Sequence, residues 1–211
     1  MRIPIILAIL FYSSSVWAVD NVNSAWLGTF AKKEITEKYF GWIEAQMRYG
    51  LDAGGTNQIL YRTGVLRKIG ENHEIGFLYA YIQGGSNKEH RWTLQHVQNY
   101  GRFLDLKFSH RARLEARFLE DDDDDAGRFR YLIRAEGETK PSPAIVIWNE
   151  IFLNTTRDSW TRDRLDDRNR FFIGAKMKIG NIRGEFGYLN QYVPRRTESV
   201  SEHIATFYFF F

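Results

Sequence analysis

Charged residues recur at every second position in two segments, and this spacing is the feature most able to do chemistry. Segment 111–118 reads RARLEARF and segment 127–135 reads GRFRYLIRA. A β-strand points successive side chains to opposite faces, so each segment places a row of guanidinium groups, with a carboxylate in the first, on one face. Such a row can attract anions, as charged rings do in channels, or it can pair internally into a network of salt bridges.

The same alternation runs through most of the chain and indicates long strands. Ten segments of about 10 to 13 residues show it, which matches the roughly 9 to 11 residues that a tilted strand needs to cross a bilayer, whereas globular strands have about 5 to 6 residues. The predicted fold is therefore all-β: an antiparallel, up-and-down transmembrane β-barrel. The predicted strands are 39–51, 56–68, 74–83, 88–99, 107–119, 127–137, 144–154, 168–179, 181–192 and 201–211.

The strand count has a close alternative. Segment 26–33 looks like one more strand, and eleven conflicts with the even counts of single-chain bacterial barrels. Either this segment is a plug or rim strand and the barrel has ten strands, or another strand is hidden and the count is twelve.

The N-terminus predicts export. Arg2 precedes an apolar stretch, 3–11, and Val16 and Ala18 have the small-residue spacing of a cleavage site, so residues 1–18 are predicted to be a signal peptide and 19–211 the barrel domain. Loss of Arg2 lowers the formal net charge from +3 to +2, which gives no electrostatic case for nucleic acid. The sequence has no cysteine, which excludes a disulfide-stapled secreted domain.

Composition supports the inverted arrangement of a membrane barrel. Aromatic residues make up 16% of the chain and charged residues 26%; a barrel in a membrane faces aromatics to lipid and charges to the lumen. An Arg or Lys that faces lipid near the midplane costs about 2 to 4 kcal/mol, so the charged faces are predicted to line the lumen. The predicted lumen-lining residues are Glu44, Arg48, Arg111, Arg113, Glu115, Arg117, Arg128, Arg130, Arg134, Arg170, Lys176, Lys178 and Glu185.

The opposite faces are predicted to meet lipid. The last segment, HIATFYFFF, ends on three alternating phenylalanines that share one face, which suits a final strand in an apolar medium. The predicted lipid-facing residues are Phe118, Phe129, Tyr131, Phe171, Ile173, Phe186, Tyr188, Phe207, Phe209 and Phe211.

Several blocks resemble the domain-of-unknown-function 2490 family of predicted bacterial outer-membrane β-barrels. The most specific is segment 169–192, and FYFFF at 207–211 is similar to the C-terminal signal that the barrel assembly machinery recognises. The resemblance implies a barrel fold and location in the bacterial outer membrane, with no established activity. The other blocks are Trp26, EAQMR (44–48), YRTGVLRKI (61–69), EHR (89–91) with Gln95, SHRARLEARF (109–118) and WNEIFLNT (148–155).

The expected function is a small outer-membrane barrel with a basic, ion-paired lumen, in a structural role or as a narrow, anion-preferring channel. A lumen filled by its own side chains and a conducting pore both fit the sequence. The expected partners are outer-membrane lipid, lipopolysaccharide, the barrel assembly machinery through the strand that ends at Phe211, and a small anionic solute. No cofactor, metal or nucleic acid is expected, and the run 121–125, DDDDD, is interpreted as a solvated acidic loop.

Two other functional classes are compatible with an exported all-β protein. An outer-membrane lipid or lipopolysaccharide hydrolase would need a serine or an activated water beside a histidine and an acid, but His90, His96, His110 and His203 form no convincing triad with nearby serines. A soluble periplasmic β-sandwich that binds a ligand is the third class.

Overall fold

The computed structural model describes residues 19–52, 57–122, 124–137, 143–156, 164–195 and 198–211. The predicted signal peptide, 1–18, lies outside the described residues. The strands are β1 Val19–Glu34, β2 Tyr39–Gly50, β3 Gln58–Lys68, β4 His73–Gly84, β5 Asn87–Phe103, β6 Leu106–Leu119, β7 Ala126–Glu136, β8 Ala144–Asn154, β9 Asp166–Ile179, β10 Ile182–Val193 and β11 Ser199–Phe210.

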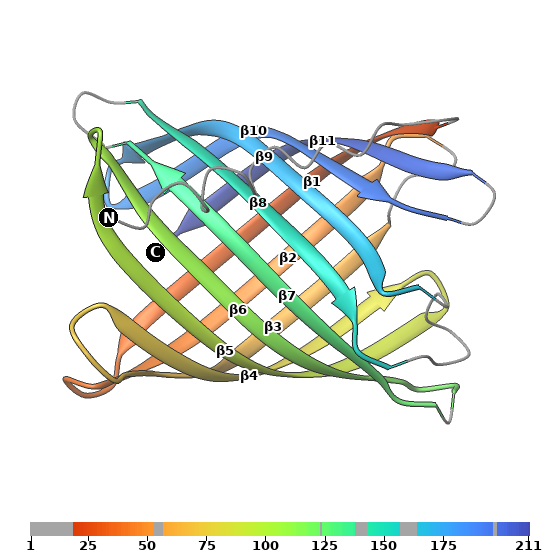
Figure 1. The fold of residues 1–211 in the computed structure, drawn as a ribbon, viewed down its shortest axis with the longest axis horizontal. Helices are drawn as coiled ribbons and strands as arrows, with labels where there is room; N and C mark the ends of the chain where they lie inside the picture. Colours follow the sequence, from red (N-terminus) through yellow and green to blue (C-terminus); the bar gives the residue numbers. More distant parts are fainter. Residues whose placement is uncertain (1–18, 53–56, 123, 138–142, 157–163, 196–197) are drawn as a thin grey trace.

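These eleven strands form one closed barrel (Figure 1), in which each strand pairs antiparallel with the next along the chain and β1 pairs parallel with β11. The predicted counts of ten and twelve are both wrong. Segment 26–33, taken as a plug or rim strand in one interpretation, lies within the 16-residue strand β1. Closure requires only that both edge strands find a partner, and a parallel pair between first and last strands allows an odd count. The single closed sheet also differs from the two packed sheets of a sandwich.

The odd count places the two ends of the barrel domain at opposite ends of the barrel. Residue Phe211 lies at the end that carries the short β9–β10 turn, where Gly180 takes a φ of 60°. Strands β8 and β10 end at the other end, as the alternation of strand direction requires, and β1 begins there as well. Among the described residues no helix is long and apolar enough to cross a membrane.

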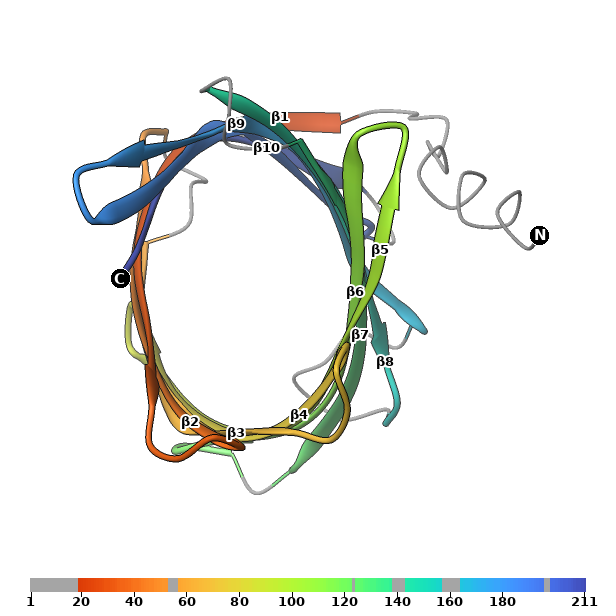
Figure 2. The same ribbon diagram turned by 90° about the vertical axis from the view of Figure 1, so that its left-hand side faces the viewer.

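The barrel is flattened in cross-section, with β3 and β4 at one narrow end and β9 and β10 at the other (Figure 2). Glycines permit the sharp curvature there, because a bend brings neighbouring atoms into the space of a Cβ. A Cβ on Gly187 would lie 2.8 Å from the ring of Phe172, and one on Gly64 would lie 2.7 Å from Leu78. Side chains of both long walls line one cavity in the lumen.

The inner face carries more aromatic residues than the composition argument anticipates. Aromatic side chains as a residue type are expected to face lipid. Several of them instead lie inside the barrel, where they pack between strands and against guanidinium groups. They fill space that the charged side chains of a flattened barrel of eleven strands leave open. One inner cluster consists of Trp26, Leu132, Val146, Trp148, Phe172, Leu189 and Ile204.

Candidate functional site

The predicted lumen-lining residues all lie on the inner face of their strands, and twelve of the thirteen are drawn together. Ten line one cavity, Glu115 is buried beneath its arginines, and Lys176 pairs with Glu136 at 2.8 Å. Lys178 differs, because it lies near the end of β9 and is exposed. The ten that line the cavity are Glu44, Arg48, Arg111, Arg113, Arg117, Arg128, Arg130, Arg134, Arg170 and Glu185.

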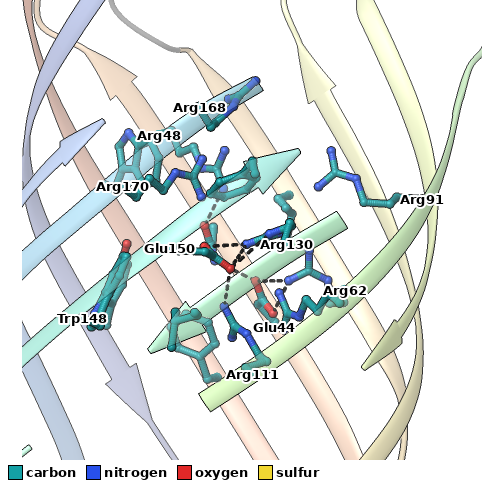
Figure 3. A pocket seen from close by; sticks show the side chains of 18 of the residues that line it. Glu44, Arg48, Arg62, Arg91, Arg111, Arg130, Trp148, Glu150, Arg168 and Arg170 are labelled. Atoms are coloured by element: carbon teal, nitrogen blue, oxygen red, sulfur yellow. Dashed lines mark hydrogen bonds and ion pairs between the residues drawn. The ribbon is translucent and has the colours of Figure 1, made fainter. Parts of the chain in front are cut away.

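The cavity has a volume of about 230 Å³ and a strongly basic lining (Figure 3). Eleven arginines and four glutamates surround it, together with aromatic and amide side chains. A cavity of this size has room for several water molecules. Its lining has an excess of positive charge that its own glutamates do not balance.

The first group of arginines is paired to carboxylates. Glu150 of β8 accepts hydrogen bonds from Arg130 at 2.9 Å and from Arg111 at 3.0 Å. The Arg130 guanidinium contacts two carboxylates, since its Nη1 also donates to Glu115 at 2.8 Å. Bidentate and charge-assisted pairs of this kind are the strong ones, and they join β6, β7 and β8 side by side.

The pairing continues along the same wall. Arg128 donates to Glu115 at 2.7 Å and to Asp167 at 3.1 Å, so it connects β7 to β9. Glu89 of β5 accepts from Arg91 at 2.6 Å and from Arg117 at 2.8 Å. The result is a continuous network of ion pairs from β5 to β9, with all of its carboxylates buried.

An aromatic ring stands among these cations. The Phe152 side chain is 1% exposed, and four guanidinium groups lie near its ring, with Arg130 at 4.4 Å and Arg170 at 4.7 Å from the ring centroid. The other two, Arg128 and Arg168, lie at 5.2 and 5.8 Å. Each such contact is worth about 0.5 to 2 kcal/mol, which offsets part of the repulsion between the cations.

The second group of arginines has only neutral partners among the described residues. Arg48 donates to the side-chain oxygens of Gln58 at 2.6 Å and Gln46 at 3.0 Å. Arg113 donates to Gln95 at 2.8 Å and Arg170 to Gln191 at 2.7 Å. Within the described part of the chain, no carboxylate lies within ion-pair distance of these three groups.

Some residues that line the lumen are absent from the set predicted from the sequence. Arg62, Glu89, Arg91 and Arg168 lie at alternating positions of their strands, so the same pattern would have found them. Trp26 gives no such signal, because a tryptophan at alternating spacing is equally compatible with a lipid-facing position.

The predicted lipid-facing residues lie on the outer face of the barrel. Phe207, Ile173 and Tyr188 are among its exposed apolar side chains. Tyr188 donates to or accepts from His203 at 2.6 Å. The others on the outer face are Phe118, Phe129, Tyr131, Phe171, Phe186 and Phe209, and Phe211 follows the end of β11, where its N–H donates to Phe30.

The histidines lie on the outer face, where three have tyrosine partners and the other two, His73 and His96, contact each other at 3.3 Å. His110 contacts Tyr131 at 3.3 Å, and His90 contacts Tyr79 at 2.6 Å. None of the described histidines is hydrogen-bonded to a serine, and no group of three or more His, Cys, Asp or Glu in the described ranges is placed to hold a metal ion.

Comparisons with known proteins address the family to which the chain belongs. A relative in Methylorubrum extorquens, described as an uncharacterized protein, is 27% identical over 178 residues, which covers 78% of this chain and 77% of that protein. No solved structure matches the chain. The model of a family described as "Protein of unknown function (DUF2490)" matches residues 23–202, so the chain belongs to the DUF2490 family.

Proposed function

We propose that this protein is a bacterial outer-membrane β-barrel whose lumen is a narrow path that prefers small anions. The observation that carries the proposal is the positive charge of the inner cavity, which is lined by eleven arginines and four glutamates. Rings of arginine and lysine favour anions in known pores, and here the flattening of the barrel brings such a ring into a small space.

The outer surface supports a membrane setting. A closed barrel pairs every strand edge, which the bilayer core demands of any spanning structure. Its outer face exposes apolar side chains on nearly every strand, including Ile43, Phe77, Leu94 and Phe207. In water an apolar surface of this extent would be a liability, whereas in lipid it stabilises the barrel.

The loops suggest an orientation. The end with Phe211 has short turns such as 104–105 and 180–181, and the opposite end carries the longest connection, 155–165. Outer-membrane barrels have short periplasmic turns and longer extracellular loops. We therefore place Phe211 at the periplasmic side, where the proposed partner is the barrel assembly machinery; lipid and lipopolysaccharide surround the outer face. Export by cleavage of residues 1–18 belongs to the same proposal.

The test is the reversal potential of the refolded barrel in a planar bilayer under a salt gradient. The expected result is discrete conductance steps whose reversal potential has the sign of anion selectivity. The Arg113→Gln variant is expected to lower the anion preference, because it removes a cavity-lining cation that has no carboxylate partner. Arg67→Gln, on the exposed outer face of β3, is the matched control and leaves selectivity unchanged.

Folding is checked separately by the heat-dependent gel mobility of the barrel. Cation selectivity would contradict a basic lumen that governs permeation. A silent bilayer with a demonstrably folded barrel would contradict conduction and leave a plugged structural barrel.

A further inference from the structure

Two arginines, the half-buried Arg48 and the buried Arg170, flank one buried tryptophan. The Arg48 guanidinium of β2 lies 4.2 Å from the ring of Trp26, and the Arg170 guanidinium of β9 lies 4.9 Å from it. Trp26 on β1 is 2% exposed and Arg170 is 7% exposed. Figure 3 shows Arg48 and Arg170 gathered on one side of the cavity, next to Arg168.

Each of the two arginines is held through a glutamine instead of directly by a carboxylate. The Gln46 amide donates to Glu44 at 2.7 Å, and its oxygen accepts from Arg48. The Gln191 amide donates to Glu202 at 2.8 Å, and its oxygen accepts from Arg170. In both relays the glutamate orients the amide and the amide orients the guanidinium, so the arginines are fixed in place while their charge is not neutralised by direct contact.

The site also contains buried donors without acceptors. The Trp26 Nε1 and the Arg48 Nε atoms are buried and have no hydrogen-bond partner in the part of the chain that the structure describes. An unpaired buried donor costs about 1 to 3 kcal/mol, and an unpaired buried cation costs several. A buried indole N–H beside two guanidinium groups that have no carboxylate partner among the described residues is a favourable place for a negatively charged acceptor.

We propose that Arg48, Trp26 and Arg170 bind the anionic oxygens of a small carboxylate or phosphate solute. Guanidinium forks match the planar oxygens of these groups and donate to them in pairs, and the indole N–H supplies one further donor. The cavity volume of about 230 Å³ leaves room for a small anion and a few waters. This site names the solute class of the proposed lumen and rests on that proposal in taking the cavity to be reachable by solutes.

The test is binding of inorganic phosphate and of acetate to the full refolded barrel in detergent, followed by calorimetry and by the urea midpoint of unfolding. Saturable binding with an upward shift of the midpoint is expected for the native chain with at least one of the two anions, and which one binds identifies the group. The same is expected for Arg67→Gln, an exposed outer-face arginine that serves as the matched control.

Two variants make the site falsifiable. The Arg48→Gln/Arg170→Gln double variant is expected to lose saturable binding. Trp26→Phe keeps an aromatic ring and removes the N–H, and it is expected to weaken binding about tenfold, as loss of one hydrogen bond to a charged group implies. Unchanged affinity in both folded variants would overturn the site, as would no saturable binding of either anion to the folded native barrel.

Failure of the site and failure of the proposed function are distinguishable. A barrel that binds phosphate through these residues but stays silent in the bilayer keeps the site and contradicts conduction. Anion-selective conductance without saturable binding keeps the proposed function and overturns the site.

Discussion

The lumen contains two groups of arginines, each with buried and half-buried members, that differ in what they touch. Arg111 and Arg130 share the carboxylate of Glu150 on the wall formed by β6, β7 and β8. Arg48 and Arg170 touch glutamine oxygens and the face of Trp26. The difference teaches that burial of an arginine does not define its role: the paired group joins strands, and the amide-held group retains charge that a ligand can use.

The largest effect is expected from removing a carboxylate of the paired group. Glu150→Gln leaves Arg111 without its carboxylate and Arg130 with Glu115 alone, and breaking a buried ion pair costs about 3 to 5 kcal/mol. The free energy of unfolding, from urea titration of the barrel in lipid vesicles, is expected to fall by that amount. A loss under about 1 kcal/mol would mean that the network does not join the strands.

A smaller loss of unfolding free energy is expected from a substitution at the narrow end of the barrel that β9 and β10 form. Both groups of arginines depend on the shape of this end. In Gly187→Ala the new Cβ would meet the ring of Phe172 and the backbone of β9, and overpacking of this kind costs about 1 to 3 kcal/mol. The same urea titration measures it. Gly85→Ala has no neighbour in its way, but its φ of 60° adds strain; Gly137→Ala, with only ordinary contacts, is therefore the better control and is expected to change little.

Removal of an arginine from the amide-held group is expected to cause no large loss of unfolding free energy, in contrast to a substitution in the paired group. Arg170→Met removes a cation that has no carboxylate partner and keeps an apolar side chain against Trp26 and Phe152. In buffer free of carboxylate and phosphate, the unfolding free energy is expected to stay within about 1 kcal/mol of the native value or to rise, since apolar replacements of buried charges are often neutral or stabilising. A loss as large as that of Glu150→Gln would erase the distinction between the groups.

The smallest effect is expected at the rim. Lys32 and Glu74 form an ion pair at the end of the barrel that carries Phe211, with the lysine side chain 36% exposed. Exposed pairs contribute about 0 to 1 kcal/mol, so Lys32→Gln is expected to lower the unfolding free energy by no more than that. A larger loss would show that ion pairs stabilise this barrel irrespective of burial.

The sequence predicts the barrel and the inward rows well, because alternation in long strands is a local property. Segments 111–118 and 127–135 place their charges on the inner face as the period of two requires. The strand count failed because the start of β1, with its asparagines and serine, shows no clear alternation, and because its parallel pairing with β11 is set only when the barrel closes. The assumption that the number of strands is even excluded the observed number, eleven.

The candidate site was less predictable than the fold. Trp26 and Arg48 face each other across the consecutive strands β1 and β2. Arg170 lies on β9, and it reaches Trp26 only because the barrel closes between β1 and β11. Which arginine receives a carboxylate and which a glutamine depends on register between strands, and composition carries no information on it. The excess of inward arginine was visible in the sequence, but its location was not.

The central claim is that the amide-held arginines bind an anion, and anomalous diffraction tests it most directly. Crystals of the refolded barrel grown with selenate would locate a bound oxyanion by its selenium signal. We predict a peak between the Arg48 and Arg170 guanidinium groups, beside the Trp26 Nε1. Selenate found only on exposed lysines and arginines of the loops, with Arg48 and Arg170 contacting water alone, would contradict the account.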